Sequence, residues 1–227
     1  MSTRTKKENL ARFHRETIQT TAKALFLEKG VTGTTMDDVA RAADYSKSTV
    51  YVYFKSKDDI LYHIIRDGMA GFETAITERL AERRSFREFY LSMYEQLVAM
   101  HAADPVVFEG LAGFIHIHPA DGIDDAVIRD IYDIGERIID HLTAEFERGI
   151  AEGAVSGDIV PLDAVFTMWF ALCGIIEKTY AKTDYITQRT GKSPDAFMRT
   201  AFDTLLRSLL PVRGASLSPL ARGIVRK

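Results

Sequence analysis

Apolar residues recur every three or four positions along most of this chain, which is the period of an amphipathic helix. The first run covers about 9–29, and Gly30 follows it where a left-handed C-terminal cap is expected. Two short helical segments, 36–43 and 47–53, come next, and each is preceded by a hydroxyl side chain that can cap it. A much longer helix is predicted at 57–80.

The rest of the chain is also predicted to be helical, because the same spacing continues almost to its end. The predicted helices cover the ranges 86–100, 105–119, 127–150, 164–176 and 194–210. The helix at 164–176 is apolar on every face, and a polar connection at 182–192 separates it from the last one. No segment alternates convincingly with a period of two, so the predicted fold class is all-α.

Charge is distributed unevenly along the chain. Residues 1–57 contain eleven Lys and Arg against six Asp and Glu, a net charge of +5, whereas the whole chain carries −3. A basic unit joined to an acidic remainder favours a polyanion as the partner of the first unit. The single cysteine excludes a disulfide framework, and the longest uncharged run, 13 residues at 164–176, is too short to span a bilayer. We therefore expect a cytoplasmic protein with no membrane contact.

The two short helices and the tight turn between them have the layout of a helix-turn-helix. In that motif the first helix crosses the DNA backbone and the second enters the major groove, where its first turn reaches base edges. The residues expected to read bases are Lys47, Ser48 and Thr49. The residues expected to contact phosphates are Thr35, Tyr51, Tyr53 and Lys57.

The segments 35–43 and 46–57 resemble the DNA-binding domain of the tetracycline-repressor (TetR) family, and the resemblance extends over roughly 17–61. It implies a transcriptional regulator that binds palindromic operator DNA as a homodimer, most often as a repressor. The turn position that is commonly Gly in the family is Asp44 here, a residue type that tolerates left-handed geometry. Ser48 stands where Gly is common, so the operator sequence does not follow by analogy.

The resemblance also implies a division of the chain into a helix-turn-helix domain at 1–57 and an effector-binding and dimerisation domain at 58–212. The Gly-, Ser- and Pro-rich composition of 213–227, with its basic residues, predicts a mobile basic tail. The effector is expected to be a small apolar or aromatic molecule, because the second domain is rich in aromatic and Met side chains. The candidate effector-binding residues are Phe72, Met93, Met100, Phe108, Phe114 and Trp169. The candidate dimer-interface residues are Phe170, Ile176, Phe197, Ala201 and Leu205. Apart from the resemblance, the same side chains suit an ordinary core.

Other functions receive less support from the residues. His116 and His118 stand two positions apart, so on a helix they point to different faces and do not form a metal pair. No phosphate-binding loop, nucleophile elbow or zinc-protease motif occurs, so we expect neither an enzyme nor a bound cofactor. Two alternatives stay open: a DNA-binding architectural or division factor without an effector, and a small all-α enzyme with a buried His or Tyr.

Overall fold

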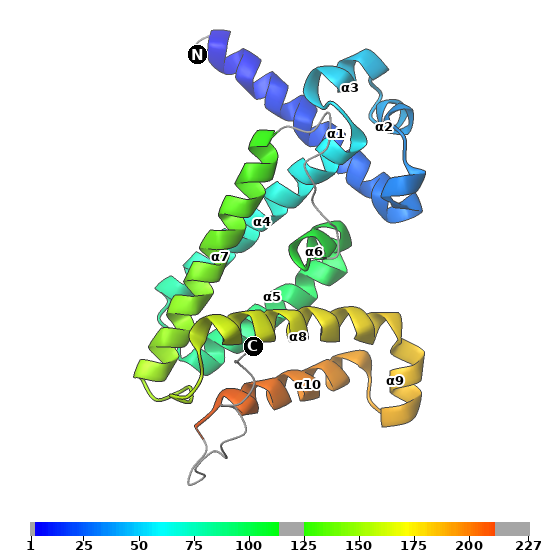
Figure 1. Ribbon diagram of the computed structural model, residues 1–227. Helices are drawn as coiled ribbons and strands as arrows, with labels where there is room; N and C mark the ends of the chain where they lie inside the picture. Colours follow the sequence, from blue (N-terminus) through cyan, green and yellow to red (C-terminus); the bar gives the residue numbers. More distant parts are fainter. Residues whose placement is uncertain (1–2, 114–124, 212–227) are drawn as a thin grey trace, which may run out of the picture.

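The computed structural model describes residues 3–113 and 125–211, and every regular element in these two ranges is a helix (Figure 1). The N-terminal helices are α1 (Thr3–Gly33), α2 (Met36–Ala42), α3 (Lys47–Tyr53) and α4 (Lys57–Ala81). The remaining ones are α5 (Phe86–Ala103), α6 (Pro105–Leu111), α7 (Asp125–Ala151), α8 (Pro161–Ala181), α9 (Thr183–Thr190) and α10 (Pro194–Leu209). The all-α prediction is confirmed. None of the helices in the described ranges has the length and apolar character that a membrane span needs.

Local sequence signals explain where most of these helices begin and end. The side chains of Ser46, Ser56 and Ser193 each accept a hydrogen bond from the backbone N–H three residues later, at the starts of α3, α4 and α10. Gly30 interrupts α1 with a φ of 77°, as its position in the sequence predicted, and a short turn continues to Gly33.

Two predicted boundaries were wrong. The helix that starts at Pro105 ends at Leu111 rather than near residue 119, and Gly113 follows with a left-handed φ of 78°. The segment 182–192, predicted to be a connection, contains α9, which ends at the left-handed Gly191. Helix α9 has no buried residue, so no apolar stripe marks it in the sequence.

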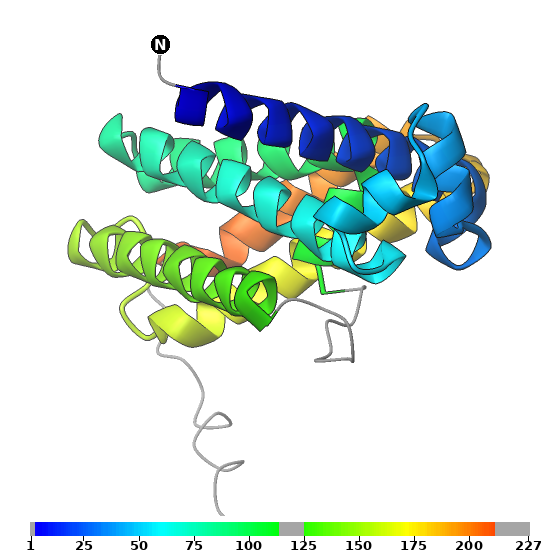
Figure 2. The same cartoon turned by 90° about the horizontal axis from the view of Figure 1, so that it is seen from above.

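Helix α4 occupies the centre of the molecule. It packs against α1 on one side and α7 on the other, and Figure 2 shows it between these two helices. Helices α2 and α3 gather at the end where α4 begins, whereas α8 and α10 lie side by side at the opposite end (Figure 1). The long helix therefore connects the helix-turn-helix to the larger helical bundle.

The contact of α4 with α6 is unusually close because glycines face side chains on both helices. A Cβ added to Gly68 of α4 would lie 2.2 Å from Cγ1 of Val107, and one added to Gly110 of α6 would lie 2.6 Å from Cγ1 of Ile65. Both partner side chains are buried. The position of α6 on α4 thus depends on the absence of side chains at these two glycines.

Replacing Gly68 with alanine tests this close approach. The added methyl overlaps Val107, so the free energy of unfolding should fall by about 1–3 kcal/mol. The matched control is Gly71→Ala in the same helix, where no atom lies within 4 Å of the added Cβ. Alanine should stabilise the helix there by up to about 1 kcal/mol. Urea unfolding followed by circular dichroism gives both values, and equal stabilities for the two variants would contradict the packing described.

Candidate DNA-binding surface and ligand cavity

The start of α2 is held by a reciprocal cap. The Thr35 hydroxyl accepts a hydrogen bond from the Asp38 N–H at 3.1 Å and donates one to the Asp38 carboxylate at 2.8 Å. Lys29 and Arg41 lie 3.1 and 2.9 Å from the same carboxylate. The hydrogen bonds from Thr35 contribute most to lowering the pKa of Asp38, which falls to about 2. The hydroxyl of Thr35 therefore already has partners within the protein.

The turn between α2 and α3 is supported from α1. Asp44 adopts a left-handed φ of 57°, which confirms the prediction made from its place in the motif. The Tyr45 hydroxyl lies 2.7 Å from Nδ1 of His14 on α1. The same imidazole ring lies 5.5 Å from the ring of Tyr53, and the Arg15 guanidinium lies 5.9 Å from that ring. Helix α1 thereby fixes both the turn and the last turn of α3.

The outward face of α3 carries most of the residues predicted to read bases. Lys47, Ser48 and Tyr51 are exposed, and Thr49 is half-buried. The Ser46 hydroxyl lies within 2.8 Å of the hydroxyls of both Ser48 and Thr49. Sequence reasoning missed Val52, which is 75% exposed on the same helix. An apolar residue within an otherwise polar segment was the available signal.

Lys47 links α3 to α2. Its ammonium lies 2.8 Å from a carboxylate oxygen of Asp37, and the hydrogen bond to Asp37 raises the pKa of Lys47. Both side chains are largely exposed, so the ion pair can exchange for a phosphate or base contact at small cost.

The side chain of Lys57 is half-buried and bonded within the protein, whereas the sequence predicted a contact with a DNA phosphate. Its ammonium donates to the backbone carbonyl of Val31 at 2.8 Å and to those of Thr32 and Thr34 at 3.3 Å. These carbonyls lie at the end of α1 and in the turn before α2, where helix geometry leaves them without intrahelical partners. Lys57 thus stabilises the connection between α1 and α2, a role that no local pattern in the sequence reveals.

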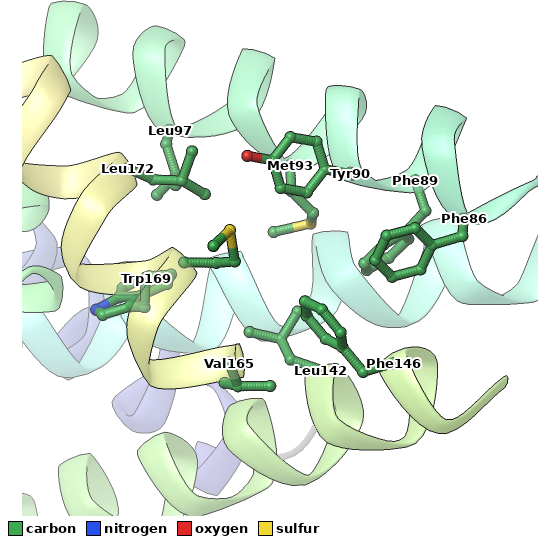
Figure 3. A pocket seen from close by; sticks show the side chains of 11 residues that line it. Phe86, Phe89, Tyr90, Met93, Leu97, Leu142, Phe146, Val165, Trp169 and Leu172 are labelled. Atoms are coloured by element: carbon green, nitrogen blue, oxygen red, sulfur yellow. The ribbon is translucent and has the colours of Figure 1, made fainter. Parts of the chain in front are cut away.

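A small, partly open cavity lies between α5, α7 and α8 (Figure 3). Its volume is about 40 Å³, close to the space of one water molecule. The lining residues are Phe86, Phe89, Tyr90, Met93, Leu97, Leu142, Phe146, Val165, Met168, Trp169 and Leu172. A second cavity of about 190 Å³ lies towards α4 and the end of α6, and Leu142, Val165 and Trp169 line both.

The predicted effector-binding residues are distributed unevenly around this cavity. Met93 and Trp169 line it, and the ring of Phe72 contacts Trp169 edge-on at 5.8 Å. Met100 and Phe108 pack in the core and line neither cavity. Phe114 lies outside the described residues, as do His116 and His118. The missed lining residues of α5, such as Phe86 and Tyr90, share the apolar stripe of Met93, which was the signal that could have placed them.

The predicted dimer-interface residues also differ in exposure. Phe170 is 65% exposed on α8 and stacks on the exposed Phe166 at 5.9 Å. Phe197, Ala201 and Leu205 are half-buried on α10. Ile176 is completely buried within the chain, so its assignment to the interface was wrong. The error follows from the sequence pattern, because a helix that is apolar on every face does not show which face lies inside.

The free cysteine and the potential metal ligands of the described residues are candidate sites of chemistry. Burial raises the pKa of the Cys173 thiol to about 12, so it remains protonated and unreactive at neutral pH. No group of three or more His, Cys, Asp or Glu side chains in 3–113 and 125–211 is arranged to hold a metal ion.

Comparison with known proteins agrees with the geometry of the N-terminal helices. Residues 18–64 match the family model described as "Bacterial regulatory proteins, tetR family", and this segment contains α2 and α3 completely. The HTH-type transcriptional regulator SrpR of Pseudomonas putida is 24% identical over 154 residues, which cover 63% of this chain and 72% of SrpR. The HTH-type transcriptional repressor KstR2 of Rhodococcus jostii is 30% identical over 86 residues, which cover 36% of this chain and 42% of KstR2.

Solved structures extend the likeness to the whole fold. A transcriptional regulator of the TetR/AcrR family from Thermobifida fusca has a TM-score of 0.63 at 22% identity, covering 89% of this chain and 98% of that chain. The transcriptional regulator FadR from Bacillus subtilis, solved in complex with stearoyl-CoA, has a TM-score of 0.63 at 18% identity, covering 86% and 98%. At these identities the TM-scores show a shared fold, and the match to residues 18–64 shows a DNA-binding domain of the tetR family of bacterial regulatory proteins. The chain thus carries a tetR-family helix-turn-helix domain near its N-terminus and has the fold of solved TetR/AcrR-family regulators.

Proposed function

We propose that this protein is a homodimeric repressor that binds a palindromic operator and is released by a small apolar effector. The observation that carries the proposal is the exposed polar face of α3, with Lys47, Ser48 and Tyr51, on a unit of charge +5. A short helix with hydrogen-bonding side chains on its free face suits the major groove. Binding to DNA from upstream of its own gene, measured by fluorescence anisotropy, tests the proposal directly.

In the proposed complex Lys47, Ser48 and Thr49 read base edges, and Tyr51 and Tyr53 contact phosphates. Thr35 and Lys57 contribute indirectly in this proposal, because their polar atoms hold the start of α2 and the end of α1 in place. The domain boundaries of the proposal are 1–57 for DNA and 58–212 for effector and dimer, with α4 crossing between them. The tail at 213–227 lies outside the described residues.

Two-fold symmetry follows from the proposed operator, since one recognition helix reads only a half-site. The faces available for a partner are the exposed Phe170 of α8 and the half-buried apolar residues Phe197, Ala201 and Leu205 of α10. Because α8 and α10 pack side by side, two copies can form a four-helix interface.

The route from the bundle to the DNA-binding helices runs through polar contacts as well as through α4. The Lys23 ammonium on α1 lies 2.7 Å from the Asp104 carboxylate at the start of α6, and Gln19 donates to Asp67 of α4 at 3.0 Å. A ligand that displaces α6 or α4 therefore moves α1. Because two recognition helices must lie about 34–36 Å apart to fit successive major grooves, a shift of a few ångströms lowers operator affinity.

An apolar effector is supported by the lining of the cavity and by the adaptable side chains of Met93 and Met168. FadR, with the same fold, was solved with stearoyl-CoA bound, a molecule with a long apolar chain. The small volume of this cavity favours a second candidate, a DNA-binding factor without an effector. Such a factor would bind DNA that no small molecule releases.

The first prediction concerns base reading. Thr49→Ala should lower discrimination at one operator position by about 1–3 kcal/mol, because a hydrogen bond to a base edge is lost. Tyr51→Phe should weaken binding to all sequences alike, because phosphate contacts carry no sequence information. Thr190→Ala on the distant α9 is the control. Anisotropy titrations on the operator and its single-base variants distinguish the cases, and full discrimination by Thr49→Ala would refute the assigned role.

The second prediction concerns assembly. Light scattering should give a homodimer with close to twice the chain mass of 25.5 kDa. Phe170→Glu should shift the population to monomer, because it places a charge in an apolar interface. Tyr132→Glu alters an exposed aromatic residue on α7 and should leave the dimer intact. A monomer of the unaltered chain at micromolar concentration would refute the proposed assembly.

The third prediction concerns the effector. Trp169 is the only tryptophan, so intrinsic fluorescence reports the wall between the two cavities. The neutral fluorophore N-phenyl-1-naphthylamine should quench this emission saturably and release operator DNA. Trp169→Leu should impair release more than it impairs DNA binding. Operator binding that persists against this probe and a broad metabolite panel would favour the effector-free candidate instead.

A further inference from the structure

One polar group is buried in the wall of the apolar cavity. Tyr90 on α5 is only 5% exposed, and its hydroxyl has no hydrogen-bond partner among the described residues. Figure 3 shows its oxygen on the side of the ring that faces Leu97 and Leu172, which also line the cavity. Asp59, Thr143 and Thr179 have buried polar atoms of the same kind, but they line neither cavity.

An unpartnered buried hydroxyl is costly, because it loses its hydrogen bonds to water and gains none in return. Phenylalanine would fill the same space without that cost. Burial raises the pKa of the Tyr90 phenol well above its ordinary value, so the hydroxyl keeps its proton at neutral pH. The lining of the cavity thus includes the neutral Tyr90 hydroxyl as a donor, and the indole N–H of Trp169 is the other neutral donor among its mostly apolar residues.

We propose that Tyr90 determines effector specificity by donating a hydrogen bond to a neutral carbonyl oxygen on an otherwise apolar ligand. This inference rests on the proposed effector function and names the chemical class of the effector. A carboxylate does not suit the site, because none of the lining residues is cationic and a buried charge would be uncompensated. A hydrocarbon without oxygen leaves the hydroxyl unpaired.

The space for such a ligand comes from joining the two cavities. Leu142, Val165 and Trp169 lie between the smaller cavity of about 40 Å³ and the neighbouring cavity of about 190 Å³, and they line both. Displacement of the Trp169 ring opens one into the other, and the flexible Met93 and Met168 side chains adjust to the ligand. The carbonyl oxygen of the ligand then lies next to the Tyr90 hydroxyl, and its apolar part extends past Trp169 into the larger cavity.

Acetophenone and α-methylstyrene test the proposal, because they have the same shape and differ by a carbonyl oxygen in place of a CH₂ group. Binding to the full-length chain is measured by ligand-observed NMR titration. We expect acetophenone to bind roughly fivefold more tightly than α-methylstyrene, as one buried hydrogen bond predicts. Benzoate, the charged analogue, should bind more weakly than acetophenone. Tyr90→Phe should abolish the preference for the ketone.

Tyr94→Phe is the matched control, because it removes a hydroxyl from the same helix while its ring packs on Phe202 outside both cavities. This variant should keep the preference. Thermal unfolding gives an independent readout: Tyr90→Phe should melt at the same or a higher temperature, because it loses an unpaired polar group. A lower melting temperature would show that the hydroxyl already has a partner, and would overturn the proposal.

Equal affinity for the two probes, or a preference that survives Tyr90→Phe, would overturn the assignment of Tyr90. Absence of binding by all three probes would overturn it as well. Operator binding by the unaltered chain is measured on the same samples. If DNA binding persists in these cases, the regulatory function stands and only the ligand inference fails, whereas loss of DNA binding would refute the proposed function itself.

Discussion

Helix α4 belongs to both parts of the molecule, and the rest of the structure depends on its burial from several sides. Near its start, Ile60 and Leu61 are buried in the core, where α4 packs against α1. In the middle, Ile65 packs against Gly110 of α6, and further along Phe72 contacts Trp169. Since sharp kinks in an α-helix need a specific cause, the proposed effector would act at the DNA-binding end by displacing α4 near Phe72.

The polar contacts around α1 complete this connection. Asp104 caps the start of α6 through the Val107 N–H and at the same time accepts a hydrogen bond from Lys23. Lys57, the first residue of α4, holds the carbonyls at the end of α1. Helices α1, α4 and α6 are thus joined by these polar contacts as well as by their packing.

The features that the sequence predicted well are those that depend on neighbouring residues. The caps Ser46 and Ser56, the left-handed Asp44 and the bounds of α3 all follow from side chains within a few positions of the backbone that they satisfy. Helix α9 was not predicted, because it has no buried residue and therefore no apolar stripe. The helix beginning at Pro105 was predicted to be too long, because apolar residues continue in the sequence beyond Leu111.

The features that could not be predicted well from the sequence depend on contacts between distant segments. The three carbonyls that surround the Lys57 ammonium lie more than twenty residues away in the sequence. The burial of Ile176 and the orphan hydroxyl of Tyr90 depend on which helices surround them, and periodicity carries no information about that. The helix-turn-helix was therefore predictable as a local motif, whereas the cavity required the packed structure.

The proposed effector would have to enter a cavity that is nearly filled in this structure. In the closed form Trp169 packs on Phe72, which favours closure, while the unpaired Tyr90 hydroxyl opposes it. A ligand shifts such an equilibrium only by the difference between its affinities for the open and closed forms. The proposed carbonyl-bearing effector would gain from both sources, because it would replace the lost packing and supply the missing acceptor. If the operator prefers the closed form, linkage requires that DNA weakens effector binding by the same factor by which the effector weakens DNA binding. The orphan hydroxyl and the close-packed helices are then two parts of one switch, in which the first selects the ligand and the second carries its effect to α3.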